Sequence, residues 1–469
     1  MSAPLSDEQK TIHLLNRISF GPSPKEVQRV NRLGLRGYLN EQLAPEAIPD
    51  SAVEEKVAHL KTMRMNNREL FEIYPPPKIA KEAGMAMANS MNAPRFIIIE
   101  LQQARLLRAV DSERQLYELM VDFWSNHFNV FAAKGADRWL MTSYDRDTIR
   151  PHALGKFRDL LLATAQSAAM LFYLDNWLSV SPSAPVARVA ANVRRRGINE
   201  NYAREVMELH TLGVDGGYSQ EDVREVARCF TGWTLRRPRG DAEFYFNSRL
   251  HDQGAKTVLG TRITAGGMED GIQVIDLLAR HPATAKFIAT KLVRRFVADN
   301  PPPALVDRAA DAFRRSDGDI RVVLQTIVEA PEFFSREVYQ AKIKKPIEYV
   351  ASALRLTEAE IKVTPQLLRY LARMGEPLFL SQPPTGYPDV GSSWISSDML
   401  LTRMNFATDL AANRVDGARV QSRDPDNVQA LARLVAPDSL SQATQSALAE
   451  SAASEKLALL LAAPEFQRR

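Results

Sequence analysis

Apolar residues recur every three or four positions through most of the chain, which is the period of amphipathic helices. The clearest stretch follows Gln115, where one stripe carries Leu116, Leu119, Met120, Phe123, Trp124 and His127. Ser112 and Gln115 have the spacing of a capping box at the start of this helix. The pattern therefore predicts that His127 lies on the buried face of a core helix.

The beginning of the chain predicts two further helices. The first spans about 7–18, and the second begins after Ser23, with Pro24 at its first position and Glu26 in its first turn. The next stretch, which contains three consecutive prolines at 75–77, is less regular. We expect it to connect more ordered parts of the protein.

The middle of the chain predicts two helices and a hairpin. Helices are expected over 201–213 and 220–233, and Gly213 suits the left-handed position after the first. The segments 243–246 and 256–259 have the composition of strands. They predict one small hairpin.

The expected fold is mainly α, a large multi-helix globular body with a small β-hairpin insertion around 243–260. A chain of 469 residues exceeds the roughly 250–300 at which one hydrophobic core stops growing. We expect an N-terminal helical pair (1–45), an irregular connecting arm (46–93), a central helical domain with the candidate site (94–340) and a C-terminal helical region (341–469).

Composition narrows the function classes. Hydrophobic residues at 45% and charged residues at 25% are ordinary for a packed protein. The net charge of +4 is spread along the chain, so nucleic acid is not an expected partner. The single cysteine, Cys229, excludes an internal disulfide and a zinc site built on several thiolates.

The sequence predicts no transmembrane segment, because no apolar run approaches the roughly 18 residues that a span needs. The first residues are polar and do not form an apolar leader. As written, the chain is expected to be cytoplasmic, and it is periplasmic or secreted if a leader has been removed.

Common catalytic signatures are absent from the sequence. It has no phosphate-binding loop, no dinucleotide-binding glycine fingerprint, no H-E-x-x-H and no G-x-S-x-G. Three of the seven histidines instead fall in three polar segments, 123–129, 199–213 and 251–254. We expect any chemistry to lie there.

These segments belong to a larger set of motifs. The set includes Leu-Asn-Arg-Ile-Ser-Phe-Gly at 15–21, Trp-Ser-Asn-His-Phe at 124–128, Asn-Tyr-Ala-Arg-Glu at 201–205, Glu-Leu-His-Thr-Leu-Gly at 208–213, Phe-Thr-Gly-Trp at 230–233, His-Asp at 251–252, His-Pro-Ala-Thr-Ala at 281–285 and Lys-Pro at 345–346. With them the chain resembles the bacterial domain-of-unknown-function 1800 family over nearly its whole length. That family has no established activity, so the resemblance implies no particular reaction.

Helical geometry orders the polar residues of 201–213. At about 100° per residue, Glu205 and Glu208 fall on the same side of the face defined by Tyr202, and His210 falls on the other side. Glu208 and His210 are thus roughly 160° apart on a regular helix and cannot share a metal ion. Glu205 and Glu208 can.

The first hypothesis is a carboxylate and histidine site. Glu205 and Glu208 would face His127, with His251 or Asp252 brought in by the hairpin loop, and these five are the candidate ligands of a divalent metal ion. His127 would be a ligand or the general base, and Tyr202 and Trp233 would line the pocket. The candidate catalytic residues are His127, Tyr202, Glu205, Glu208 and His251.

The alternative is a non-catalytic scaffold or binding protein. Glu205 would then pair with Arg224, Arg228 or another arginine in a buried ion pair, and His127 would be a hydrogen-bonded core residue. The proline-rich loops, above all the long turn at 382–391, would bind a protein partner.

Overall fold

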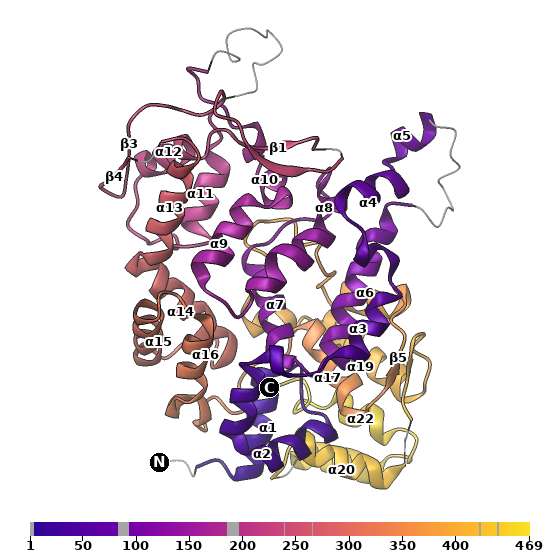
Figure 1. Ribbon diagram of the computed structural model, residues 1–469. Coiled ribbons are helices and arrows are strands. Elements are labelled where there is room, and N and C mark those ends of the chain that lie inside the picture. The colour runs from indigo at the N-terminus through magenta and orange to yellow at the C-terminus, as the bar shows by residue number, and fades with distance from the viewer. Residues whose placement is uncertain are drawn as a thin grey trace.

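Helices dominate the computed structural model, as the sequence predicts (Figure 1). The structure describes residues 4–82, 93–184, 197–238, 240–264, 266–421, 424–438 and 440–469. Within these residues it has 22 α-helices and three two-stranded antiparallel sheets. The mainly α fold class is confirmed.

The N-terminal part contains five helices. Both predicted helix starts are confirmed, and the Ser23 hydroxyl accepts the backbone N–H of Glu26 as predicted for an N-cap. The part of the predicted irregular arm that the structure describes holds short helices. The five are α1 (Asp7–Ile18), α2 (Pro24–Gln42), α3 (Ser51–Ala58), α4 (Asn67–Ile73) and α5 (Pro77–Glu82).

Helices α6 and α7 run through the middle of the molecule (Figure 1). The central helices are α6 (Arg95–Asp111), α7 (Gln115–His127), α8 (Asp137–Ser143), α9 (Phe157–Gln166), α10 (Ala168–Tyr173), α11 (Glu200–Glu208), α12 (Gln220–Cys229), α13 (Glu269–Arg280), α14 (Pro282–Phe296), α15 (Pro303–Arg315) and α16 (Ile320–Val328).

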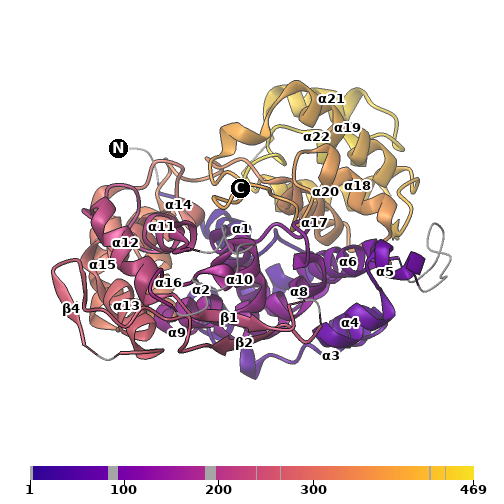
Figure 2. The ribbon, with the colours of Figure 1, turned by 90° about the horizontal axis from the view of Figure 1, so that it is seen from above.

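The C-terminal helices gather on one side of the molecule, next to α6 (Figure 2). They are α17 (Pro346–Leu356), α18 (Pro365–Arg373), α19 (Ser397–Ala411), α20 (Pro425–Val435), α21 (Gln442–Glu450) and α22 (Lys456–Ala462), with a small sheet of β5 (Glu360–Ile361) and β6 (Ala418–Arg419).

The predicted single hairpin is wrong in its pairing. Strand β2 (Glu243–Phe246) pairs with β1 (Trp233–Arg236), and β3 (Lys256–Val258) pairs with β4 (Thr261–Ile263). The predicted helix over 220–233 ends at Cys229, and Trp233 opens a strand instead. Each strand thus pairs with a close neighbour in sequence, and Leu259 and Gly260, both with positive φ, form the two-residue turn of the second hairpin.

Two predicted helix ends are also wrong. Helix α7 begins at Gln115 without the predicted capping box, because the Ser112 hydroxyl donates to Asp50 and the Gln115 amide donates to the Ala109 and Ser112 carbonyls. Helix α11 ends at Glu208, where the His210 N–H donates back to the Glu205 carbonyl. His210 therefore lies in a turn, and its predicted position on a regular helix does not apply.

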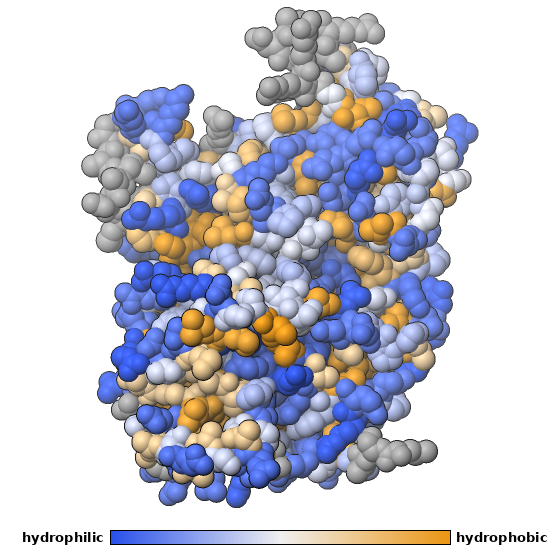
Figure 3. All heavy atoms as spheres, turned by 180° about the vertical axis from the view of Figure 1, so that it is seen from behind, coloured by the Kyte–Doolittle hydropathy of each residue, from blue (hydrophilic) through white to orange (hydrophobic). Residues whose placement is uncertain are grey.

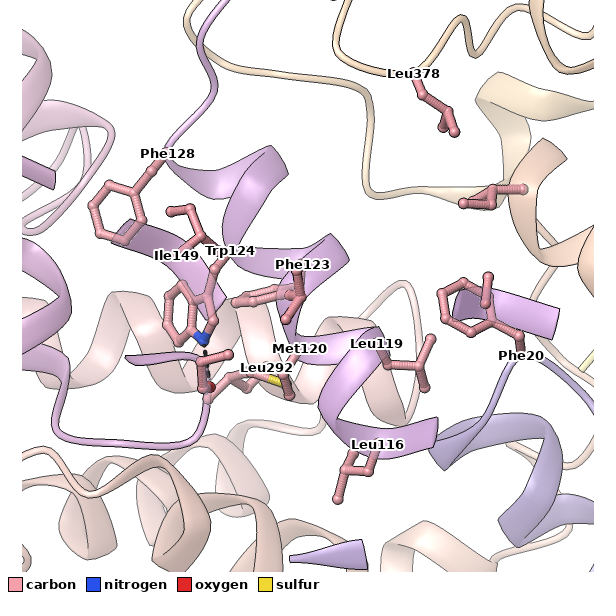
Figure 4. Packing of buried hydrophobic residues seen from close by; sticks show 14 of the residues in the cluster. Phe20, Leu116, Leu119, Met120, Phe123, Trp124, Phe128, Ile149, Leu292 and Leu378 are labelled. Atoms are coloured by element: carbon pink, nitrogen blue, oxygen red, sulfur yellow. Dashed lines mark hydrogen bonds between the residues drawn. The ribbon is translucent and has the colours of Figure 1, made fainter. Parts of the chain in front are cut away.

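The core surrounds α7 (Figure 4). Trp124 is fully buried, and its indole N–H donates to the Ala153 carbonyl over 2.9 Å. Leu116, Leu119 and Met120 continue the same buried stripe, as predicted. None of the helices in the described ranges is long and apolar enough to cross a membrane.

Candidate functional site

His127 ends α7 inside an aromatic pocket. Its Nε2 lies 3.0 Å from the His210 carbonyl oxygen, and the rings of Trp124, Phe128 and Phe287 pack around it. Burial, together with the positive charge of Lys291, lowers the pKa of His127 well below its ordinary value. The imidazole is therefore neutral, and since a carbonyl only accepts, its Nε2 carries the proton.

Glu205 and Glu208 share one side of α11, as predicted. Glu208 is half-buried, and its carboxylate accepts a hydrogen bond from the Tyr218 hydroxyl over 3.1 Å. Burial, reinforced by the charge of Glu208, raises the pKa of Glu205. Tyr202 is fully buried against the ring of Phe230 and packs in the core.

Among the described residues, Glu205 has no arginine within 4 Å, and the predicted partners Arg224 and Arg228 contact other carboxylates. Arg228 binds Asp252 over 2.9 Å and also contacts Glu225. Arg224 contacts Glu200 and Glu221. Because α12 presents its own acidic residues one turn away, both arginines are satisfied on that helix and its neighbours.

His251 and Asp252 belong to another cluster. The Nδ1 of His251 lies 2.8 Å from the Thr231 carbonyl, and its Nε2 lies 3.1 Å from Asp270. Lys256 donates to the same Asp270 carboxylate over 2.8 Å. The cluster fixes the loop before β3 against α12 and α13.

The structure thus places the candidates in three separate sets of contacts. His127 contacts His210, the pair Glu205 and Glu208 contacts Tyr218, and His251 lies with Asp270. Across the described ranges, no three His, Cys, Asp or Glu side chains are grouped so that they could hold a metal ion. Trp233, expected to line the pocket, is fully buried between Phe230 and Phe244.

A buried polar network that the sequence did not single out joins α7 to the C-terminal helices. Lys345, just before α17, lies 3.4 Å from Asp122 and 3.1 Å from Glu376, and Arg105 lies 3.2 Å from Asp122. Burial raises the pKa of Glu376, although Lys345 opposes this effect. The residues line a cavity of about 40 Å³, which has room for water but not for a substrate.

The long turn at 382–391 packs onto α7. The Asn126 amide donates to the Tyr387 carbonyl over 3.0 Å and accepts its N–H over 2.7 Å. Asn129 donates to the carbonyls of Ser381 and Pro383. Much of the polar surface of this turn is therefore occupied within the protein, which does not favour it as a partner-binding loop.

A larger hollow lies between α6 and α18. It has a volume of about 620 Å³, and its buried leucines are Leu368, Leu371 and Leu378. We call it the α6–α18 groove. It is lined by Ile99, Gln102, Pro365, Gln366, Leu368, Arg369, Leu371, Ala372, Pro377, Leu378, Leu380 and Asp416.

Comparison with known proteins decides the family. The model of the family described as "Protein of unknown function (DUF1800)" matches residues 13–468. The chain belongs to this family. No curated protein and no solved structure matches it.

Several motif residues of this DUF1800 protein hold elements together. Arg17 is fully buried and donates to the Val338 carbonyl. Arg355 donates to the carbonyls of Gly21 and Val110 over 2.9 and 2.7 Å. These contacts give both arginines a structural role, because buried guanidinium groups require partners.

A Glu205→Gln variant separates a structural from a chemical role of the α11 carboxyls. We expect the free energy of unfolding at pH 7 to stay within about 1 kcal/mol of wild type or to rise, because the variant removes repulsion from Glu208 and breaks no ion pair among the described residues. Urea unfolding followed by circular dichroism measures it. A loss near 3 kcal/mol would show a buried pair instead.

Asp137 is a buried carboxyl that sequence patterns did not reveal. Neither of its carboxyl oxygens has a hydrogen-bond partner, and the residue is fully buried. Burial raises its pKa well above the ordinary value, with Lys134 opposing. The fold therefore favours the protonated form of Asp137.

This raised pKa makes the stability of the protein depend on pH. The unfolded chain ionises above about pH 3.9, so the contribution of Asp137 to stability is full below that pH and is lost as pH rises towards its folded pKa. We expect the free energy of unfolding of Asp137→Asn to increase relative to that of wild type. The difference should grow by about 1.4 kcal/mol per pH unit from about pH 4 up to the folded pKa of Asp137. Urea unfolding at several pH values measures the difference, and a constant difference would contradict the assignment.

Proposed function

We propose that this protein is a non-catalytic binding protein whose α6–α18 groove takes an acidic, apolar segment of a partner protein. The observation that carries the proposal is the lining of the groove: leucines and prolines, with Arg369 and Asp416 as its charged residues. The lining contains no His, Cys, Lys, Ser or Glu, so it offers no nucleophile beside a base. Its volume of about 620 Å³ suits a bound ligand group.

The openness of the groove to solvent favours a chain segment over an enclosed small molecule. Pro365, Gln366, Arg369 and Ala372 on α18 are exposed along its edge. Apolar side chains of a partner would pack on the buried leucines, with the rest of its chain in water. Figure 3 shows the molecule from behind, where hydrophobic side chains gather in patches among hydrophilic ones.

The charge beside the groove favours acidic partners. An adjoining hollow of about 190 Å³ is lined by Arg369, Arg373 and Arg414, with Asp416 as its one carboxylate. Arg414 contacts Asp409, whereas Arg369 and Arg373 are exposed and make no carboxylate contact within 4 Å in the described ranges. Carboxylates of a partner would be bound by these two guanidinium groups.

The test uses three fluorescent twelve-residue peptides that alternate leucine with glutamate, leucine with lysine, or serine with glutamate. We expect only the leucine and glutamate peptide to bind, as measured by fluorescence anisotropy. An Arg369→Glu, Arg373→Glu double variant should bind it at least tenfold more weakly, because each lost charge contact is worth about 1 kcal/mol or more.

The matched control reverses two arginines away from the groove. Arg308 and Arg314 on α15 are exposed and pair with Glu332 and Asp311. The Arg308→Glu, Arg314→Glu double variant changes the net charge equally, so it should leave binding within twofold of wild type. Equal binding of all three peptides, or equal loss in both double variants, would reject the groove as the binding site.

A second candidate function is acid–base chemistry at Glu205. Its raised pKa is the observation that favours this function, since a carboxyl poised above its ordinary range suits proton transfer. In that case, Glu205→Gln would abolish an activity without changing peptide binding. The groove variants would have the opposite effect.

A further inference from the structure

Six basic side chains are buried together where α14, the segment before α17 and the last residue of the chain meet. Each is at most 7% exposed. We call them the buried cation cluster: Arg17, Arg295, Lys342, Lys344, Arg403 and Arg469.

Two carboxylates contact this cluster. Glu348 lies 2.6 Å from Arg295 and 3.2 Å from Arg469, and Asp299 binds Lys342. Counted over side chains, six cations thus meet two carboxylates. Unbalanced charge is costly away from water, so the cluster requires further negative charge or the loss of protons.

The remaining contacts of the cluster are with neutral acceptors. Arg17 donates to the Val338 carbonyl, and Arg403 donates to Gln467 and to the Lys344 carbonyl. A guanidinium does not lose its proton in proteins, so deprotonation cannot balance the four arginines.

All four arginines of the cluster retain buried donors without a hydrogen-bond partner among the described residues. Apart from the nitrogens that face Glu348, these donors are Nε and Nη1 in Arg295 and Nη1 in Arg469. Arg295 and Arg469 line one small cavity, together with Lys342 and Lys345. Buried donors of this kind usually have an ion or a water as partner.

The carboxylates that line the same cavity already have other cations. Asp122 lies within 3.4 Å of Arg105 and Lys345, and Asp389 lies 3.3 Å from Lys291. Apolar atoms of Phe123, Ile343 and Trp394 complete the wall. The cavity is therefore lined by four cations and two carboxylates, and each of these side chains also contacts a side chain of opposite charge.

We propose that this cavity binds a single chloride ion between Arg295, Lys342 and Arg469. Its volume is about 20 Å³, and the space needed for one water-sized sphere is about 10–15 Å³. A monatomic anion fits this space, whereas a phosphate or an organic carboxylate does not. The ion satisfies the free guanidinium donors and reduces the positive charge of the cluster.

The pKa values of the neighbouring lysines agree with a site that lacks negative charge. Burial, with the positive charge of Arg469 adding to its effect, lowers the pKa of Lys342 to about 8. Burial also lowers the pKa of Lys344 to about 7, with Arg403 adding to the effect. A bound anion would raise both values.

The test is the thermal midpoint of the full chain at constant ionic strength. Sodium gluconate is replaced stepwise by sodium chloride or sodium bromide, so that general screening stays the same. We expect the midpoint to rise by several degrees and to saturate, because an ion that binds the folded state stabilises it. A thermal midpoint that does not change when chloride or bromide replaces gluconate, or that rises without saturation, would overturn the proposal.

Two variants locate the effect. Lys342→Met removes one lining cation and should raise the chloride concentration at half-saturation at least tenfold. Arg308→Gln removes an exposed cation far from the cavity and should leave that concentration unchanged.

A crystal grown in bromide gives a measurement that does not depend on any variant. We expect an anomalous scattering peak among Arg295, Lys342 and Arg469. A water molecule there without an anomalous signal would overturn the proposal.

Discussion

Glu348→Gln is expected to lower the free energy of unfolding by about 3–5 kcal/mol, as is usual when one partner of a buried ion pair is removed. Glu348 on α17 is 3% exposed and is the carboxylate that Arg295 and Arg469 share. Glutamine keeps the shape of the side chain but removes the carboxylate that both guanidinium groups share. Urea unfolding at pH 7 measures the loss.

The pH dependence of this loss is a further consequence. Burial alone would raise the pKa of Glu348, but Arg295 and Arg469 hold it well below the ordinary value. The stability from this carboxylate is therefore present above about pH 4.3 and is lost as pH falls towards the folded pKa. The gap between wild type and variant should narrow in acid.

Glu332→Gln is the matched control for this substitution. Glu332 pairs with Arg308 at the surface, where both side chains are partly exposed. Surface pairs contribute about 0–1 kcal/mol, so the control should lose less than that. Equal losses in the two variants would contradict a special role of the Glu348 pair.

Trp124→Ala is expected to destabilise the protein by about 3–5 kcal/mol through the cavity that it leaves. Trp124 is fully buried and packs against Phe123, Phe128 and Phe157 (Figure 4). The same unfolding measurement applies. A decrease of less than about 1.5 kcal/mol in the free energy of unfolding would show that the core around α7 relaxes to fill the cavity.

Trp124→Phe separates packing from hydrogen bonding at this position. Phenylalanine retains a ring but loses the donor to the Ala153 carbonyl. We expect a smaller loss than in Trp124→Ala, with about 1–3 kcal/mol of it from the buried carbonyl left without its donor. Equal losses in the two variants would mean that the ring itself contributes little.

Helix starts with short-range signals could be predicted from the sequence. Ser23 precedes α2 and Pro24 opens it, and both act within one turn, so their spacing is sufficient. Ser112 failed as a cap because Asp50, distant in sequence, binds its hydroxyl. A contact between residues so far apart in the chain produces no periodic pattern in the sequence.

The wrong pairing of the predicted hairpin also results from a contact that sequence periodicity does not show. Trp233 continues the apolar stripe of α12 in sequence, yet the chain turns at Gly232, which has a positive φ. An added Cβ at Gly232 would lie 2.6 Å from the Asn247 carbonyl, so the turn depends on a close approach within the fold. Periodicity alone could not separate the end of the helix from the beginning of the strand.

The candidate site could be predicted only within one helix. The shared side of Glu205 and Glu208 follows from helical geometry, and the structure confirms it. Which residue faces His127 depends on how α7 packs against the turn after α11, and that turn presents the His210 carbonyl. The network of Lys345, Asp122 and Glu376 was missed for the same reason.

Hydrogen–deuterium exchange of the protein with and without the leucine and glutamate peptide tests the groove most directly. We expect new protection in α18 and in the part of α6 around Ile99 and Gln102, which line the groove. Protection that appears instead around His127 and Glu205, with α18 unchanged, would contradict a binding function at the groove.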